Sequence, residues 1–294
     1  MTAPGGYEAL RERAAWLDVS SRGKILVTGE DRARLLHAMT TNNVQALTPG
    51  DWCYAYFLSA QGRILADANI LCLPDALLLD TEPESVKKIF DHLEQYIIAD
   101  DVTLEDQTGM LAMFAVEGPE ASALVDAFAP VFPISLTGAG GFVVIVPVGE
   151  KAGIEQKLEA AAVTAATPEA FRIVRIERGK PRYGEDLTER FLSQEANQAH
   201  ALSFTKGCYL GQEIVERVRS RGQVHRLLMP LRIESTEVPA PGTKVTEGTA
   251  SVAEITSAAL SPALGLVVAL GYVRTDKARP GMEMRLGDAV VRVV

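Results

Sequence analysis

Several features that define other protein classes are scarce in this chain of 294 residues. It has three cysteines, Cys53, Cys72 and Cys208, an odd number without a Cys-x-x-Cys pair. This pattern supports neither a disulfide framework nor a structural zinc site, and we expect no metal site. Free thiols of this kind suit a reducing compartment.

Basic charge and long apolar runs are also scarce. The formal net charge is −9, which disfavours a general nucleic-acid binder, because such a protein must neutralise phosphates. The apolar run 264–270 is interrupted by Gly265 and is too short to span a bilayer. Residues 1–6 lack the basic start and apolar core of a signal peptide. We therefore expect no membrane association and a cytoplasmic protein, or a mitochondrial matrix protein in a eukaryote.

The rest of the composition is that of a globular chain, with 47% hydrophobic and 23% charged residues. Its length favours two or three domains. Over the first two-thirds, strand-like segments alternate with amphipathic helices. The elements predicted there are a strand at 24–28, a helix at 31–39, a hairpin of 51–58 and 63–73, and a helix opened by a capping box at 81–84.

The same order recurs further along the chain. Val27 to Leu36 aligns with Val116 to Val125, each reading as a strand, a glycine turn and a helix. A strand at 142–148 and a helix at 150–162 follow the second copy. Two related α+β halves are the simplest interpretation.

From Arg226 onward, short strand-like segments are separated by turns rich in proline and glycine. Such a series is typical of a small antiparallel β-barrel. We therefore divide the chain into a first α+β half at 1–108, a second α+β half at 109–224 and a C-terminal barrel at 225–294.

The most informative stretch runs from Lys206 to Glu213 and reads Lys-Gly-Cys-Tyr-Leu-Gly-Gln-Glu. A nearby lysine and the N-terminus of a following helix would lower the pKa of Cys208 and favour the reactive thiolate. Cys208 would then react with alkylating probes faster than Cys53 or Cys72. The competing interpretation is a buried packing cysteine beside a tight turn.

This stretch resembles the signature of the YgfZ-type folate-binding proteins, relatives of the glycine-cleavage aminomethyltransferase (the T-protein). Three further blocks carry the resemblance, at 29–44, 61–67 and 172–184. The resemblance implies two ferredoxin-like halves and a C-terminal antiparallel β-barrel, arranged around a central hole that holds tetrahydrofolate.

The resemblance also implies a set of folate-binding residues. Glu177, in the Arg-Ile-Glu block, would clamp the pterin edge with two hydrogen bonds. Tyr183, Tyr54 and Tyr56 would sandwich the ring, although each could equally be plain core. The candidates for the anionic glutamate tail are Arg217, Arg219, Arg221 and Arg226, and Lys206 and Gln212 of the signature complete the set.

Asp67 and Cys208 are the candidate catalytic residues. In the aminomethyltransferases, an aspartate in an Ile-x-Asp-Asp-type run polarises the substrate amine and the folate. Here the run from Ile64 to Ala68 reads Ile-Leu-Ala-Asp-Ala, so an alanine takes one acidic position. Loss of a catalytic carboxylate would leave a site that binds folate without transferring a one-carbon group.

The leading hypothesis is a tetrahydrofolate-binding protein that assists iron–sulfur cluster assembly or repair and thereby affects tRNA-modifying cluster enzymes. Cys208 would be a transient cluster ligand shared with a partner protein. The alternatives are an aminomethyltransferase acting on a lipoyl-carried aminomethyl group and another folate-dependent one-carbon transferase. In each, we expect Asp67, Glu177 and the Cys208 loop to converge on one cavity.

Overall fold

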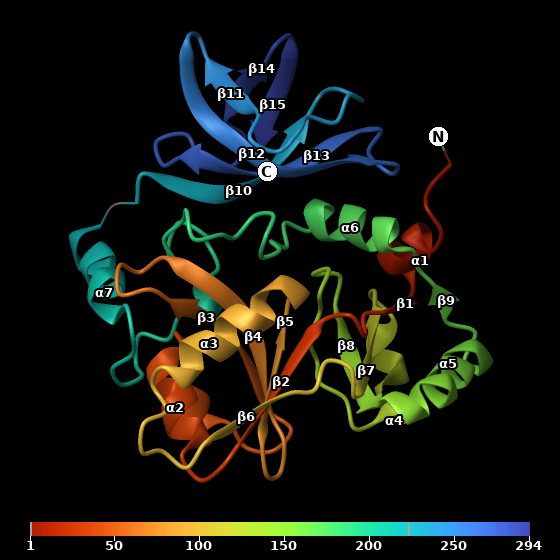
Figure 1. Cartoon of the computed structure of the whole chain (residues 1–294). Coiled ribbons are helices and arrows are strands. Elements are labelled where there is room, and N and C mark those ends of the chain that lie inside the picture. The colour runs from red at the N-terminus through yellow and green to blue at the C-terminus, as the bar shows by residue number, and fades with distance from the viewer. Residues whose placement is uncertain (1, 223) are drawn as a thin grey trace.

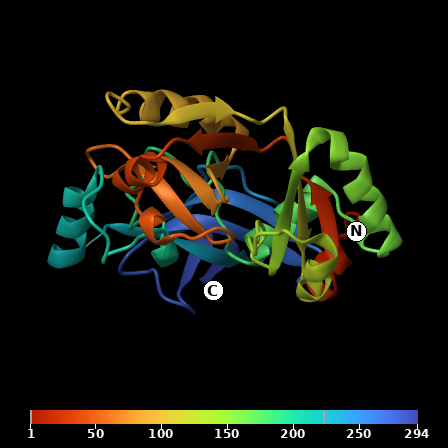
Figure 2. The ribbon, with the colours of Figure 1, turned by 90° about the horizontal axis from the view of Figure 1, so that it is seen from below.

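The computed structural model describes residues 2–222 and 224–294. It contains two sheets with their helices and a closed barrel. The two sheets lie side by side, and the barrel packs across one end of both (Figure 1, Figure 2). None of the helices in the described residues has the length and apolarity needed to cross a membrane.

The first sheet has five strands in the order β3-β4-β5-β2-β6. Its strands are β2 (Gly23–Thr28), β3 (Trp52–Leu58), β4 (Ile64–Cys72), β5 (Leu77–Thr81) and β6 (Thr103–Asp106), and its helices are α2 (Arg32–Met39), η1 (Val44–Ala46), η2 (Pro83–Ser85) and α3 (Val86–Glu94). Apolar residues of α2 and α3, such as Leu36 and Leu93, form one core with Ile25 and Ile70 of the sheet. The two helices therefore bury one face of this sheet.

The second sheet has four strands in the order β8-β7-β1-β9. Its elements are α1 (Tyr7–Glu12), β1 (Ala15–Asp18), β7 (Leu111–Glu117), η3 (Ala121–Leu124), α4 (Val125–Phe128), β8 (Gly141–Pro147), η4 (Val148–Glu150), α5 (Lys151–Ala160) and β9 (Thr164–Ala165). Strand β1 pairs with β7, so an N-terminal segment belongs to a sheet whose other strands lie at residues 111–165. The two halves are interleaved in sequence.

The C-terminal part is a closed barrel of β10 (Arg226–Ile233), β11 (Lys244–Glu247), β12 (Ala250–Ser261), β13 (Leu266–Arg274), β14 (Glu283–Leu286) and β15 (Ala289–Val293). Three further helices, α6 (Pro168–Glu177), η5 (Ala199–Ala201) and α7 (Gln212–Arg221), precede it. Val174 of α6 packs in one core with Val268 of the barrel, Leu71 of the first sheet and Met113 of the second. This shared core holds the three parts together.

The predicted α+β class with a C-terminal antiparallel barrel is confirmed. The predicted strands and helices of the first half match β2, α2, β3, β4 and α3. The predicted capping box is wrong, because Thr81 lies in β5 and its hydroxyl donates to the carbonyl oxygen of Asp67 at 2.6 Å. Local sequence pattern did not predict α1, β1, β5, β6, β9, α6, β11 and β12.

Candidate active site

A cavity of about 480 Å³ lies where the two sheets and α6 meet. Its size falls within the range of small-molecule sites. Its lining residues are Leu17–Val19 with Ser21 and Arg22, Tyr54, Asp67 and Asn69 on strands β3 and β4, Glu82 and Pro83 directly after β5, the loop Ser135–Thr137, and residues of α6 and of the segment that follows it, up to Glu185. The lining contains both apolar side chains, of leucine, proline and phenylalanine, and charged ones.

The alternation of strand β4 brings Asp67 into this cavity. Neighbouring side chains on a strand point to opposite faces. Ala66, Ala68 and Ile70 pack in the core beneath the helices, whereas Asp67 and Asn69 line the cavity. The one carboxylate retained in the Ile64–Ala68 run, that of Asp67, therefore faces the cavity. Ala66, at the other acidic position, faces the core. The loss at Ala66 removes no group from the site.

Asp67 is nearly buried, at 8% exposure, and its Oδ2 accepts a hydrogen bond of 2.6 Å from the hydroxyl of Tyr54. Burial raises the pKa of Asp67 from 3.8 to about 6; the hydrogen bond from Tyr54 opposes this shift, and the charge of Glu82 adds to it. A carboxyl group with such a pKa can exchange a proton near neutral pH, as a general acid or base must.

A network of ion pairs holds the surrounding walls. Arg22 reaches Asp80 at 2.6 Å and Glu82 at 2.5 Å, and Asn69 donates to Asp80 at 2.8 Å. Arg182 approaches Glu82 from the other side at 2.7 Å. Glu82 thus joins the first sheet to the segment after α6, and the two arginines keep the pKa of its carboxyl lowered despite burial.

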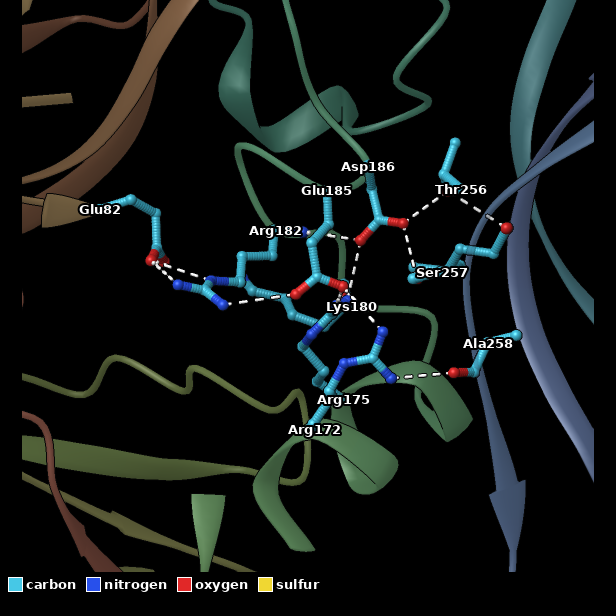
Figure 3. A network of polar contacts seen from close by, with 11 residues as sticks. Glu82, Arg172, Arg175, Lys180, Arg182, Glu185, Asp186, Thr256, Ser257 and Ala258 are labelled. Atoms are coloured by element: carbon cyan, nitrogen blue, oxygen red, sulfur yellow. Dashed lines mark hydrogen bonds and ion pairs between the residues drawn. The ribbon is translucent and has the colours of Figure 1, made fainter. Parts of the chain in front are cut away.

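The network continues into the barrel (Figure 3). Arg175 pairs with Glu185 at 2.6 Å and with the fully buried Asp186 at 2.8 Å. Asp186 in turn accepts hydrogen bonds from the hydroxyls of Thr256 at 2.5 Å and Ser257 at 2.7 Å on β12. The cavity wall formed by the segment after α6 is therefore fixed to the barrel.

Glu117, at the end of β7, holds the wall contributed by the second half. Its carboxylate is fully buried and accepts hydrogen bonds from the hydroxyls of Ser135 at 2.6 Å and Thr137 at 2.5 Å, and from the backbone N–H of Leu136. Burial raises the pKa of Glu117, and these hydrogen bonds oppose the shift. The loop Ser135–Thr137 is thereby held against the cavity.

The structure brings together three of the predicted site residues, Asp67, Tyr54 and Tyr183, all of which line the cavity. The hydroxyl of Tyr183 donates to the carbonyl oxygen of Leu65 and accepts from Lys88 at 3.2 Å. Tyr56, by contrast, is fully buried in a core cluster and is not part of the lining.

Glu177 is not among the lining residues either. Its carboxylate accepts hydrogen bonds from Tyr7 at 2.5 Å, from Ser261 at 2.6 Å and from Arg11 at 2.8 Å. It therefore ties the end of α6 to α1 and the barrel, and this geometry does not support a ligand clamp in the cavity. The expected convergence of Asp67, Glu177 and Cys208 on one cavity is not observed.

The predicted arginines also lie outside the cavity lining. Arg226 pairs with Glu195 at 3.1 Å and lies 4.7 Å from the centre of the Phe191 ring. Arg217 and Arg219 are exposed on α7, and the side chain of Arg221 is outside the described part of the chain. Arg226 thus has a packing role at the start of the barrel.

The signature loop, which we define as Lys206–Gly211, packs on helix α2, and none of its residues lines the cavity. The ammonium group of Lys206 donates to the carbonyl oxygens of His37 and Thr40 at the end of α2, as a lysine near a helix C-terminus can. Burial lowers the pKa of Lys206 to about 8, and the charge of Cys53, not of Cys208, opposes this shift. The predicted pairing of Lys206 with Cys208 is therefore not supported, although Cys208 is exposed as expected.

Gln212 accepts a hydrogen bond from the backbone N–H of Tyr209 at 3.3 Å and so supports the same loop. Arg22, Asn69, Glu82 and Lys180 also line the cavity but were not predicted from the sequence. Asn69 could have been found, because it lies two residues beyond Asp67 on the same face of a strand. Arg22 and Glu82 lie beside the paired residues Gly23 and Thr81 of β2 and β5. Local sequence does not reveal that these two strands pair.

Comparisons with known proteins agree with this architecture. The GCVT N-terminal domain family matches residues 5–136, and the glycine cleavage T-protein C-terminal barrel domain family matches residues 226–292. An aminomethyltransferase of Streptomyces coelicolor is 29% identical to this chain, over 94% of the chain and 82% of that protein. A putative chloroplastic transferase of Arabidopsis thaliana is 27% identical, over 95% of the chain and 69% of that protein.

A solved structure shows the same fold. The crystal structure of the glycine cleavage system aminomethyltransferase T of Bartonella henselae matches with a TM-score of 0.86 and 20% identity, and the match covers 98% of this chain and 86% of that one. Sequence families at both ends of the chain and a shared fold over nearly its whole length lead to one assignment. The chain belongs to the glycine cleavage T-protein superfamily.

Proposed function

We propose that this protein is a folate-dependent one-carbon transferase of the aminomethyltransferase type, which binds tetrahydrofolate in the central cavity and uses Asp67 as its acid–base group. The observation that carries the proposal is the orientation of strand β4. Asp67 faces the cavity and Ala66 faces the core, so the incomplete acidic run does not imply an inactive site. The aminomethyltransferase names of several relatives also favour this alternative over cluster assembly.

The lining suits a flat heteroaromatic ligand with polar edges. Leu17, Leu136 and Phe171 offer apolar surface, while Asp67 and Asn69 present polar groups on one strand. Tetrahydrofolate, when bound, would supply the amine nitrogens that accept the one-carbon unit. Asp67 would exchange a proton with a reacting amine, and Tyr54 would keep its carboxyl oriented through the hydrogen bond to Oδ2.

A transfer assay tests this function. Purified protein is supplied with tetrahydrofolate and a lipoyl carrier loaded with an aminomethyl group, and the release of ammonia and the formation of methylenetetrahydrofolate are measured. We expect turnover by the wild type and a loss of about 10²–10⁴-fold in Asp67→Asn, the range for removal of a general acid or base. Glu177→Gln, outside the cavity, is the matched control. Absence of turnover in the wild type, or equal rates in Asp67→Asn, would contradict the proposal.

A second candidate function is assistance to iron–sulfur cluster assembly or repair, as in the YgfZ-type proteins. The observation that favours it is the exposure of Cys208 on a loop outside the cavity. Phe204, four residues earlier in the chain, is exposed as well, and its ring centre lies 4.5 Å from the guanidinium carbon of Arg219, so a partner protein could reach these side chains. We expect tRNA-modifying cluster enzymes to be among the clients.

The two candidates predict opposite genetic results. In cells that lack this protein, the activity of an iron–sulfur enzyme is measured after complementation with Cys208→Ser or Asp67→Asn. Failure of Cys208→Ser alone would support cluster assembly. Full complementation by Cys208→Ser would exclude a required thiol.

A further inference from the structure

Three charged residues of the cavity lining form no ion pair within the described chain, and two of them are withdrawn from solvent. The arginines of the lining are paired: Arg22 with Asp80 and Glu82, Arg172 and Arg175 with Glu185, and Arg182 with Glu82 and Glu185. Asp18 pairs with Lys151, and the third unpaired residue, Glu169, is exposed to solvent. Asp67 and Lys180 remain, one of each sign, and neither forms an ion pair in residues 2–222 and 224–294.

Both of these residues are arranged around Tyr54. The tyrosine hydroxyl donates to Asp67 at 2.6 Å, and the ammonium nitrogen of Lys180 lies 5.4 Å from the centre of the same ring. His200 lies against this ring as well, with the two rings 5.4 Å apart and nearly parallel. Tyr54 therefore separates a carboxylate and an ammonium group along one wall of the cavity.

An ammonium group has three donors, and no protein acceptor within the described residues takes a hydrogen bond from the ammonium of Lys180. Such a group, partly withdrawn from water, is costly unless an acceptor is supplied. Burial lowers the pKa of Lys180, and the charges of Glu117 and Asp67 oppose that shift. The polar groups of Lys180 and Asp67 are thus available to a molecule that carries both charges.

We propose that Asp67 and Lys180 form a subsite for a small zwitterionic α-amino acid, with its amino group on Asp67 and its carboxylate on Lys180. This inference rests on the proposed function and names a second ligand of the same cavity, a free amino acid. The aminomethyl group of a lipoyl carrier has no carboxylate for Lys180 and would contact Asp67 alone. A tetrahydrofolate molecule and a small amino acid would then share the cavity.

Calorimetric titration tests the subsite with simple probes. Glycine and N-methylglycine carry both charges, whereas methylamine carries the positive charge alone and acetate the negative charge alone. Each probe is titrated into the wild type, Lys180→Met and Lys157→Met. Lys157 is an exposed lysine of α5 outside the cavity, so it controls for the loss of a positive charge. Melting curves of the variants confirm that they fold.

We expect N-methylglycine or glycine to bind the wild type and Lys157→Met equally, and about tenfold to a hundredfold more weakly to Lys180→Met, as expected for one charge-assisted contact. Methylamine and acetate should bind more weakly than either zwitterion. Absence of zwitterion binding, or equal binding by the wild type and Lys180→Met, would overturn the subsite.

Tetrahydrofolate titrated into the same proteins separates this inference from the proposed function. Failure of tetrahydrofolate to bind the wild type defeats the proposed function, whereas the zwitterion titrations decide the subsite independently. A loss of tetrahydrofolate affinity in Lys180→Met, without any zwitterion binding to the wild type, would assign Lys180 to the folate and overturn the amino-acid subsite alone.

Discussion

The two sheets of this protein follow the same local order but contribute differently to the cavity. In each, a strand ends at a glycine with a positive φ, Gly29 at 97° and Gly118 at 125°. A Cβ at Gly29 would lie 2.0 Å from the carbonyl oxygen of Asp101, and one at Gly118 would lie 2.4 Å from that of Arg13. Both turns therefore require glycine, because the neighbouring backbone leaves no room for a side chain.

The two sheets differ in the residue that precedes this glycine. Thr28, in the first sheet, makes no side-chain hydrogen bond among the described residues, whereas Glu117, in the second, binds the loop Ser135–Thr137. The first sheet places Asp67 and Asn69 in the cavity directly from a strand. We infer that the first half supplies the reactive carboxyl group and that the second half builds a wall.

The largest effect is expected when the carboxylate is moved to the other face of strand β4. Ala66→Asp would bury a charge without a partner in the core beneath α2 and α3, and we expect a loss of about 4 kcal/mol in the free energy of unfolding. Denaturant titration measures it. Wild-type stability of this variant would show that position 66 does not face the core.

Glu117→Ala tests the role of the second half. Removal of the carboxylate leaves two hydroxyls and two backbone N–H groups without their acceptor, so we expect a loss of about 3 kcal/mol in the free energy of unfolding. Thr28→Ala, at the equivalent position of the first half, should stay within about 0.5 kcal/mol of the wild type. Equal effects of the two substitutions would remove the distinction between the halves.

Asp67→Asn sharpens the assignment of the reactive group through pH. The folded-state pKa of Asp67, about 6, lies above 3.8, so the folded protein holds this proton more tightly than the unfolded chain. Ionisation of Asp67 therefore destabilises the fold as pH rises from 3.8 to about 6. At pH 7 the asparagine variant should be more stable than the wild type by up to about 3 kcal/mol, and this gain should vanish below about pH 4. Thermal melts across this range measure it; a gain independent of pH would contradict the raised pKa.

The smallest effect is expected at the exposed signature loop. Cys208→Ser should change the free energy of unfolding by less than about 0.5 kcal/mol, because Cys208 is exposed. Cys208 should also alkylate faster at neutral pH than Cys53, since burial raises the pKa of Cys53 to about 12. Mass spectrometry after timed alkylation gives both rates. A slower reaction at Cys208 than at Cys53 would show that the loop is closed in solution.

The sequence predicted the parts of the fold that depend on local pattern. The hairpin β3–β4 and helices α2 and α3 follow from alternation and helical spacing, and the barrel follows from its turns. Strand β12 was missed because its segment 250–261 is rich in alanine and serine. Helix α6 could have been found, since Thr167 precedes Pro168 at its first turn and caps the backbone N–H of Ala170.

The site was predicted only where strand alternation decides which way a side chain points. Asp67 and Tyr54 lie on paired strands, and their contact follows from the register of β3 and β4. Glu177 ends a helix, and its partners Tyr7 and Ser261 lie 170 and 84 residues away along the chain. The identity of such long-range partners depends on how the three parts pack, which local sequence does not specify.

We expect a reduced folate to bind in the cavity beside Asp67. Anaerobic calorimetric titration of tetrahydrofolate into the wild type, Asp67→Ala and Glu177→Gln tests this binding mode. We predict one binding site in the wild type, similar affinity in Glu177→Gln, and a loss of about tenfold or more in Asp67→Ala, as expected when a charged hydrogen-bonding group is removed. Unchanged affinity in Asp67→Ala together with a loss in Glu177→Gln would contradict this binding mode.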